Sequence, residues 1–390
     1  MKKFELDKRM KSFLKDFNSF IEYLAFNEVT VGKTNNFISP KFLFEINEVM
    51  EIKQEGIKPT STQVAYPLIH LFHNLSVSGR LFVRKSINGG KIILKATDRL
   101  KLFNDLSEVE KYITLIEILW VDCDFEKIRY QTHDFIDVNY TMRIVENLSV
   151  SPVNQNMHVD KNLIPLSTII LYLSYFGLID VKENELEGKE KNERVFLLGE
   201  IKVITMGLEI LKILDQRRNI ENWNLPYLRE LGEWNVEFIE EFYVPFKKLF
   251  KDGELNKTLP RKAVELKNGI YTFKVSLNKN MWAKIRFNGN HTLLDLHNYI
   301  QEAFSLDNDN MYSFFMDGVA WSKNKFTSPY DDEGPHVDEA KIGELGLDEK
   351  QSFLYLFNYS NPWRFEVEVD DIEETELRLL RPQIVEAKGN

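Results

Sequence analysis

The order of apolar and polar residues divides the chain into a helical first part and a strand-rich last part. From Thr62 to Val77, apolar residues recur at near-helical spacing before Gly79, which predicts a helix that ends at the glycine. Two short apolar runs, Leu81 to Val83 and Ile92 to Leu94, flank the turn signal Asn88-Gly89-Gly90 and predict a β-hairpin. A helix followed by a hairpin is the second half of a winged helix.

The same order of elements recurs about a hundred residues later. Leu75-Ser-Val-Ser-Gly79 matches Leu173-Ser-Tyr-Phe-Gly177 at an offset of 98, and each copy continues through a charged loop and a short strand to a closing helix. Ser107-Glu-Val-Glu110 has capping-box spacing and predicts the start of a further helix. The repeat indicates an internal duplication and two winged-helix-like units. The alternative is a less regular helical region with one or two hairpins.

The last part of the chain predicts several strands and one helix. Two strands, from Tyr271 to Leu277 and from Trp282 to Phe287, precede a helix from Thr292 to Phe304, and at least three strands follow. Apolar residues form one stripe on that helix and should cover a sheet: Leu293, Leu296, Ile300 and Phe304. We therefore expect an α+β protein, with a helical N-terminal half and a C-terminal mixed β-sheet domain with one packed helix.

Length and pattern together predict four segments. A chain of 390 residues that is 43% apolar can bury more than one core. The expected segments are a winged-helix-like unit with helical extensions (1–125), a second such unit (126–218), a helical connector (219–262) and an α+β domain (263–390).

Four motifs in the last part carry a resemblance to a known family. They are Tyr271 to Leu277, Trp282 to Phe287, Thr292 to Phe304 and Tyr355 to Val369. In this order they resemble the plasmid pRiA-type ORF-3-like family of plasmid and mobile-element proteins. The resemblance implies a C-terminal domain of that family, which has no settled activity. The ending also resembles the family's closing stretch, in which a few more residues follow, so we expect the chain to stop early.

The chain departs from the family at polar positions. Where relatives carry Asp, Gly and His near the final motif and after the helix, this chain has Asn358, Ser360, Asn361 and Asn310. An amide does not titrate as a carboxyl does, so acid–base roles at these positions lose their basis. Two interpretations stay open. In the first, the family has an enzyme site whose titratable groups are missing from this chain; in the second, these positions only form turns.

Charge singles out one basic segment in an acidic protein. The net charge of −10 argues against general nucleic-acid binding, yet residues 80–101 contain seven basic residues and one acid. In the second copy, five basic residues face six acids between Lys182 and Lys202, so that wing is nearly neutral. The residues expected to contact DNA phosphates through the first wing are Arg80, Arg84, Lys85, Lys91 and Lys95.

The signatures of common cofactor and metal sites are absent from the sequence. Glycine-rich phosphate loops do not occur, and no cofactor is expected. His70 and His73 have the spacing of metal ligands on a helix, but no third ligand is identifiable and no metal site is predicted. The single cysteine, Cys123, and the lack of a long apolar run predict a cytoplasmic protein without a membrane segment.

Three functional classes remain. The first is an interaction or regulatory protein of a mobile element, with a protein partner on an aromatic surface of the C-terminal domain. The second is a DNA-binding protein that inserts its first winged helix into a groove. The third is an enzyme with a pocket around His297, Tyr359 and Glu366 or Glu368; its catalytic residues are unknown. The acidic stretch Asp331 to Glu333 is expected to be a solvated loop. The expected binding surface consists of His297, Tyr355, Tyr359, Trp363 and Arg364.

Overall fold

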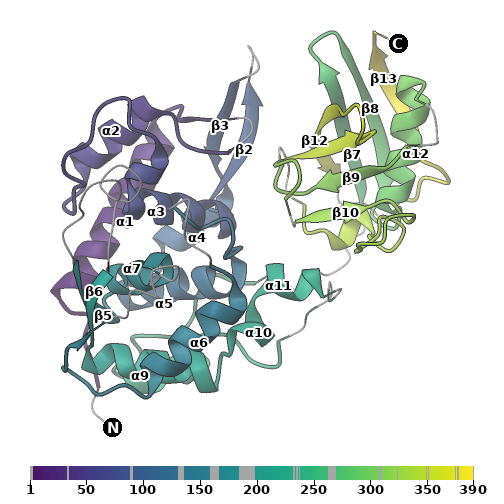
Figure 1. Cartoon of the computed structure of the whole chain (residues 1–390). Helices are drawn as coiled ribbons and strands as arrows, with labels where there is room; N and C mark the ends of the chain where they lie inside the picture. The colour runs from purple at the N-terminus through teal and green to yellow at the C-terminus, as the bar shows by residue number, and fades with distance from the viewer. Residues whose placement is uncertain are drawn as a thin grey trace.

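A computed structural model describes residues 3–389 except 33–34, 88–90, 131–135, 159–166, 184–197, 232, 234–235, 237, 262–268, 307–309, 323, 348, 350, 374 and 376. Figure 1 shows a mostly helical N-terminal domain (3–261) and a C-terminal domain (269–389) built on one large sheet. This arrangement confirms the α+β class. No helix among the described residues is long and apolar enough to cross a membrane.

The first repeat has the element order of a winged helix. Its three-stranded sheet has the order β1-β3-β2, with antiparallel pairs. The predicted helix from Thr62 is split at Pro67, because the residue before a proline disfavours the helical conformation and Tyr66 has φ −126° and ψ 74°. The predicted turn at Asn88-Gly89-Gly90 lies outside the described residues. The elements are α1 (Lys8–Phe26), β1 (Thr30–Val31), α2 (Pro40–Val49), a 3-10 turn (Gln63–Ala65), α3 (Pro67–Ser78), β2 (Phe82–Ile87) and β3 (Lys91–Ala96).

The second repeat has the same strand arrangement, β4-β6-β5. At the end of α3, Leu81 N donates to Ser76 O, and at the end of α7, Leu178 N donates to Leu173 O. These two hydrogen bonds are structurally equivalent. The sequence offset between them is one residue smaller than the predicted offset of 98. The elements are α6 (Val138–Ser149), β4 (Met157–His158), α7 (Ser167–Tyr175), β5 (Ile179–Glu183), β6 (Leu198–Val203) and α9 (Thr205–Gln216).

Further helices follow each of the two repeats. The capping box at Ser107 and Glu110 is present and begins α5, as predicted. A π-helical turn follows α5 directly, from Ile118 to Asp122. These helices are α4 (Asp98–Asn104), α5 (Glu108–Glu117), the π-helix (Ile118–Asp122), α10 (Ile220–Trp223), α11 (Leu225–Glu230) and a 3-10 helix (Val244–Leu249).

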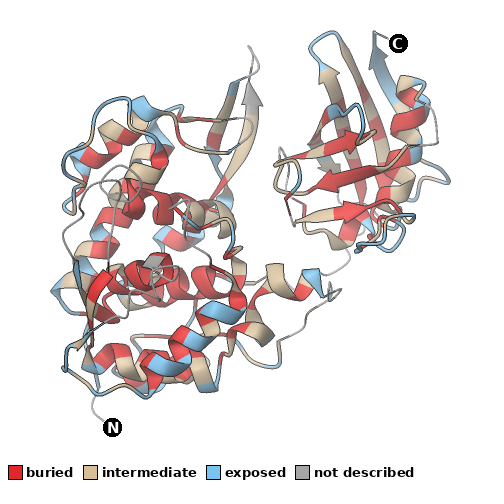
Figure 2. Cartoon of the chain, viewed as in Figure 1, coloured by how far each residue is buried: buried red, intermediate tan, exposed pale blue. Residues whose placement is uncertain are grey.

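One continuous core runs through the whole N-terminal domain. Buried apolar residues from Leu6 to Leu259 form a single cluster, which Figure 2 shows in red. The two ends of this domain also meet, because Phe4 N donates to Leu249 O at 2.7 Å and Lys3 pairs with Asp252 at 3.1 Å. The expected domain boundaries after residues 125 and 218 therefore do not coincide with a division of the hydrophobic core. The boundaries themselves remain predictions.

The C-terminal domain is a seven-stranded sheet covered by one helix. The strand order is β10-β9-β11-β12-β7-β8-β13, and every pairing between the described strands is antiparallel. The expectation of a mixed sheet was wrong. On α12, Leu293, Leu296 and Ile300 are fully buried in the core of this domain, as predicted. The elements are β7 (Ile270–Asn278), β8 (Met281–Asn288), α12 (Leu293–Phe304), β9 (Tyr312–Phe315), β10 (Lys325–Thr327), β11 (Ser352–Phe357), β12 (Trp363–Glu373) and β13 (Gln383–Lys388).

Candidate functional site

A cleft of about 1530 Å³ lies between the two domains. Its N-terminal wall includes side chains of α3 and β2, and its C-terminal wall includes the turn between β9 and β10. Clefts between domains are common ligand-binding positions in proteins. The cleft is therefore the first place to look for a functional site.

Asp317 connects the two walls of this cleft. Its backbone carbonyl accepts a hydrogen bond from Arg84 Nη1 at 3.0 Å, and its carboxylate forms an ion pair with Lys127. The other carboxylate oxygen accepts hydrogen bonds from Val319 N at 3.0 Å and from Ser322 Oγ at 2.8 Å, which fixes the turn. Burial alone would lower the pKa of Lys127, but the carboxylates of Asp317 and Asp124 outweigh it and raise that pKa.

The β9–β10 turn has a glycine at the point where the Arg84 side chain contacts it. Gly318 follows Asp317 with φ +70°, and a Cβ there would lie 2.7 Å from Arg84 Nη1. The backbone conformation thus favours glycine, and a larger residue would also displace the end of the Arg84 side chain. Burial lowers the pKa of Arg84, whereas the nearby carboxylates of Asp317 and Glu366 oppose this shift.

Two of the five predicted DNA contacts face the C-terminal domain instead of solvent. Arg80 Nη1 donates to Gly346 O at 2.6 Å, and Arg84 Nη1 donates to Asp317 O. Lys85 is half-buried, whereas Lys91 and Lys95 are exposed on β3. While they make these contacts, the side chains of Arg80 and Arg84 do not face a nucleic-acid phosphate backbone.

Helix α3, expected to enter a DNA groove, is mostly inside the protein. It packs against α1, α2, α7 and the π-helix, and nine of its residues are buried. Groove insertion requires an exposed helix face. In this arrangement α3 has no broad exposed face for that role.

His297 and Tyr355 belong to the core of the C-terminal domain. His297 Nδ1 and the Tyr355 hydroxyl are 2.7 Å apart, and the imidazole stacks on Tyr312 with ring centroids 3.5 Å apart. Burial lowers the pKa of His297 to about 3, so the ring is neutral near pH 7. Their burial corrects the expectation that these two residues form an accessible binding surface.

The remaining three predicted surface residues lie near the β11–β12 turn. Tyr359 is half-buried and its hydroxyl lies 2.6 Å from Ser313 Oγ, whereas Arg364 is exposed. Trp363 is 41% exposed and stacks on Phe365. These three residues keep a place at the surface, although their binding role stays a prediction.

Asn358 has the geometry of a turn former. Its φ is 62°, in the left-handed region, and its side-chain Oδ1 accepts a hydrogen bond from Asn361 N at 3.1 Å. Asparagine tolerates this conformation better than most residues. The geometry agrees with the interpretation that these positions form a turn.

Two exposed aromatic residues escaped the sequence prediction. Trp321 and Tyr330 are 57% and 89% exposed and lie in the segment that joins β9 to β10 and in the loop after β10. Trp321 contacts the Tyr359 ring with a centroid distance of 5.1 Å, and the Tyr359 hydroxyl lies 3.5 Å from Asp331 Oδ2. Pro329 and the following acids indicated a loop, but nothing local to the sequence distinguishes an exposed aromatic residue from a buried one.

His70 and His73 are both buried, at 1% and 3% exposure, and line the cleft. The Nδ1 atom of each lies 3.0 Å from Gln63 Nε2. Among the described residues, no group of three or more metal-ligating side chains is found. Both rings are thus hydrogen-bonded to one glutamine, and backbone groups of Lys127 and Ile128 lie against His70 as well.

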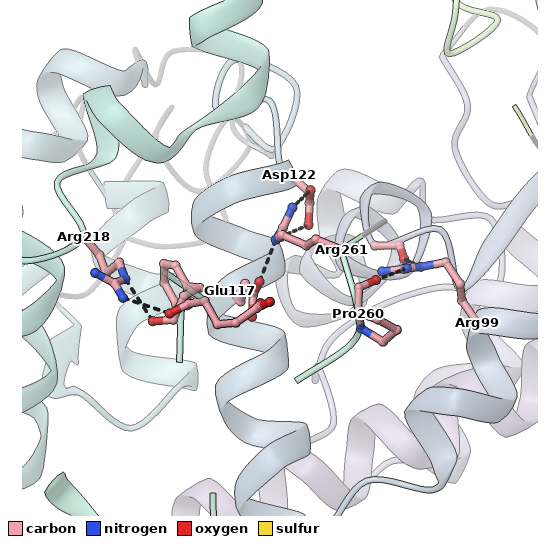
Figure 3. Close-up of polar contacts among 9 residues, drawn as sticks. Arg99, Glu117, Asp122, Arg218, Pro260 and Arg261 are labelled. Atoms are coloured by element: carbon pink, nitrogen blue, oxygen red, sulfur yellow. Dashed lines mark hydrogen bonds and ion pairs between the residues drawn. The ribbon is translucent and has the colours of Figure 1, made fainter. Parts of the chain in front are cut away.

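A buried ion cluster holds the chain where it leaves the N-terminal domain (Figure 3). Arg261 Nε donates to Glu117 Oε1 at 2.6 Å, and its two Nη atoms bind Asp122 at 2.9 and 2.7 Å. Arg99 Nη1 donates to Pro260 O at 2.9 Å. Glu117 and Asp122 lie at the two ends of the π-helix, a local irregularity often found where side chains must be specially placed. This cluster anchors the segment that leads to the C-terminal domain.

The C-terminal part of the chain is similar to a known protein family. Residues 269–390 match the family model described as plasmid pRiA4b ORF-3-like protein, which confirms the resemblance for this domain. A crystal structure of a protein of unknown function from Methanosarcina mazei Go1 is 21% identical and covers 31% of this chain and 69% of that chain, with a TM-score of 0.27. No curated protein matches the chain.

Replacing Asp317 by asparagine should loosen the contact between the domains. The substitution removes the ion pair with Lys127 and keeps the carbonyl that Arg84 uses. Because both side chains are partly solvated, we expect a loss of about 1 kcal/mol of docking free energy. Faster hydrogen–deuterium exchange in residues 312–322 would report it. Glu333→Gln, which removes an exposed partner of Lys325, is the control, and equal exchange in both variants would contradict the role of Asp317.

Proposed function

We propose that the protein is an interaction protein whose C-terminal domain binds a basic segment of a partner protein. The binding surface would consist of Trp321, Tyr330 and the acidic run Asp331, Asp332 and Glu333, here called the aromatic–acidic surface. The observation that carries the proposal is the exposure of two large aromatic side chains beside these acids. Exposed tryptophan and tyrosine beside charged residues are typical of protein-binding surfaces.

The charge of this region favours a basic partner. Five acidic residues and two lysines occur between Trp321 and Glu339. Lysine and arginine side chains bind aromatic faces through cation–π contacts, and nearby carboxylates add attraction. A partner segment with alternating basic residues could use both kinds of contact.

The surface is held in place before a partner arrives. The Trp321 ring packs against Tyr359 at 5.1 Å and against Phe315 at 6.1 Å. The hydrogen bonds of Asp317 to Val319 N and Ser322 Oγ fix the turn that carries Trp321. Preorganisation of this kind lowers the entropic cost of binding.

An enzymatic role in the predicted pocket has less support. The His297 imidazole is 5% exposed and is stacked and hydrogen-bonded within the core. A general acid or base must reach the proton that it transfers. His297 in this position would act on a substrate only after the core opened.

The exposed Lys91 and Lys95 favour a second candidate, contact with nucleic-acid phosphates. Both lie on β3 of the first wing and are exposed. Binding through them alone would be independent of sequence and would weaken steeply with salt. We further propose that the protein acts in the cytoplasm, since its single cysteine, Cys123, is buried as a thiol.

The aromatic–acidic surface can be tested with a labelled peptide of alternating lysine and glycine residues. We expect fluorescence anisotropy to report binding, and the double variant Trp321→Ala/Tyr330→Ala to lose about tenfold in affinity. Phe26→Ala removes an 81% exposed aromatic residue at the end of α1 and is the matched control. A glutamate version of the peptide tests the charge preference.

Equal binding of the lysine and glutamate peptides, or unchanged affinity in the double variant, would overturn this proposal. A labelled DNA duplex, titrated across salt, separates the second candidate. Loss of DNA binding in Lys91→Glu/Lys95→Glu, with unchanged peptide binding, would support the basic wing instead.

A further inference from the structure

The two domains do not share a hydrophobic core. Buried apolar residues form one cluster between Leu6 and Leu259 and a second cluster between Tyr271 and Val369. Figure 2 shows these clusters in red as two separate bodies. Two domains of one chain are expected to move relative to each other unless their interface is large and apolar. The contact between the domains can therefore open without breaking either core.

Two arginines at the start of the first wing reach the C-terminal domain. Arg80 Nη1 donates to Gly346 O at 2.6 Å, and Arg84 Nη1 donates to Asp317 O at 3.0 Å. The carboxylate of Asp317 also forms an ion pair with Lys127. All of these contacts are hydrogen bonds or ion pairs, so water or another oxygen acceptor can replace the C-terminal domain in them.

The C-terminal domain offers Arg84 the kind of acceptor that a nucleic acid would offer. The carboxylates of Asp317 and Glu366 favour the charged form of Arg84, although burial opposes it. Glu366 is on β12 and lies opposite Leu354 of β11, the strand that β2 contacts. A guanidinium group binds carboxylate and phosphate oxygens with the same fork of N–H donors. The acidic groups of the C-terminal domain therefore stand where phosphates would compete for Arg84.

The first wing carries further basic residues on its opposite face. Lys91 and Lys95 are exposed on β3, and on β2 their cross-strand partners are Val83 and Ile87. Residues directly opposite each other share a face of the sheet, and neighbours along a strand alternate between faces. Arg84 therefore points away from the two lysines. Docking of the C-terminal domain engages the arginine face of the wing and leaves the lysine face exposed.

We propose that the C-terminal domain is an internal inhibitor of nucleic-acid binding, which docks on Arg80 and Arg84 of the first wing and frees both arginines for phosphates when it undocks. This role rests on the second candidate function, contact of Lys91 and Lys95 with nucleic-acid phosphates, and adds a means of control to it. DNA that binds fully only to the undocked form has its affinity reduced by the fraction of chains that are undocked. Weaker docking should therefore give tighter DNA binding.

The test weakens docking in the full chain without changing a basic residue. Asp317→Asn/Glu366→Gln, here called the docking variant, removes the two carboxylates that favour the charged form of Arg84. We expect a labelled DNA duplex to bind the docking variant about tenfold more tightly in fluorescence anisotropy at constant salt. Small-angle X-ray scattering without DNA should show a larger radius of gyration than that of the unmodified chain. An unchanged DNA affinity would overturn the proposal.

A matched control removes the same charge at a distance from Arg84. Glu333→Gln/Glu386→Gln also takes two carboxylates from the C-terminal domain; the Glu333 side chain is 78% exposed, and Glu386 is exposed on β13. Loss of negative charge alone strengthens DNA binding by reducing repulsion, and the control measures that effect. A gain as large as that of the docking variant would mean that undocking is not the cause, and the proposal would be wrong.

The two arginines are tested in the undocked chain. Adding Arg80→Met/Arg84→Met to the docking variant should remove its gain of about tenfold in DNA affinity, because the phosphates lose both guanidinium groups. The radius of gyration should stay at the larger value. If the gain persists without the arginines, they do not contact DNA and the inhibitor role is refuted.

Hydrogen–deuterium exchange of the unmodified chain separates docking from the second candidate function. Saturating DNA should speed exchange in residues 312–322 and 343–347, because the bound form is undocked. If Lys91→Glu/Lys95→Glu abolishes DNA binding while DNA leaves exchange in both segments unchanged or slower, the wing binds DNA and the inhibitor role is wrong. If neither the unmodified chain nor the docking variant binds DNA, both ideas fail. This measurement also decides the question if the docking variant does not fold.

Discussion

Replacing Arg261 by methionine is expected to lower the free energy of unfolding of the N-terminal domain by about 3 to 5 kcal/mol. Arg261 forms an ion pair with Glu117, whose side chain is only 3% exposed, and it also binds Asp122 through two parallel hydrogen bonds. Burial raises the pKa of Glu117 even though Arg261 opposes that shift. Without the guanidinium group, the buried carboxyl must take up a proton or remain an uncompensated charge.

Chemical denaturation followed by circular dichroism at pH 7 measures this loss. The double variant Arg261→Met/Glu117→Gln should recover part of the stability, because the unpaired charge is gone. Arg286→Met removes a partly exposed pair with Glu373 on the C-terminal sheet and should change stability by at most about 1 kcal/mol. A loss for Arg261→Met no larger than for this control would mean that the cluster does not hold the domain together.

The stability of the N-terminal domain is expected to fall as the pH decreases from 6.5 toward 4. His70 and His73 have folded-state pKa values of about 4 and about 3, lowered from 6.5 mainly by burial. Between these values and 6.5 the unfolded chain binds protons that the folded chain does not, so acid favours unfolding. The contribution of the pair is complete above pH 6.5 and should decline by about 3 kcal/mol per pH unit for two histidines.

The measurement is a series of denaturation curves between pH 7.5 and 4.5, compared with those of His73→Gln. Glu117 and Asp16 have raised pKa values, mainly through burial, and act in the opposite direction, so the difference between the two chains is the informative quantity. Arg84 faces the pair and stays charged throughout. The variant should have about half the pH dependence assigned to the pair, whereas His158→Gln should match the unmodified chain. Parallel curves for all three would show that the pair does not titrate as proposed.

Local features were predictable from the sequence because their causes are local. The capping box at Ser107 depends on residues three positions apart, and the buried stripe on α12 follows from helical periodicity. The hairpin of β2 and β3 likewise joins neighbouring segments, as the sequence indicated.

The candidate site was less predictable because its contacts join distant parts of the chain. Arg80 meets Gly346 across 266 positions and Arg84 meets Asp317 across 233, so the basic segment gave no sign that a second domain would cover it. The same limit applies to His70 and His73. Their spacing was visible, but their shared hydrogen bonding to Gln63 depends on the split of the helix at Pro67.

The meeting of Phe4 with Leu249 gives the N-terminal domain the topology of a nearly closed loop. Such a chain tolerates circular permutation, because joining the old ends requires little new length. The C-terminal domain is then attached to the chain close to the place where the two ends of the N-terminal domain meet. Replacing the domain attached at this position would leave the core of the N-terminal domain in place, because that core is one cluster formed between Leu6 and Leu259.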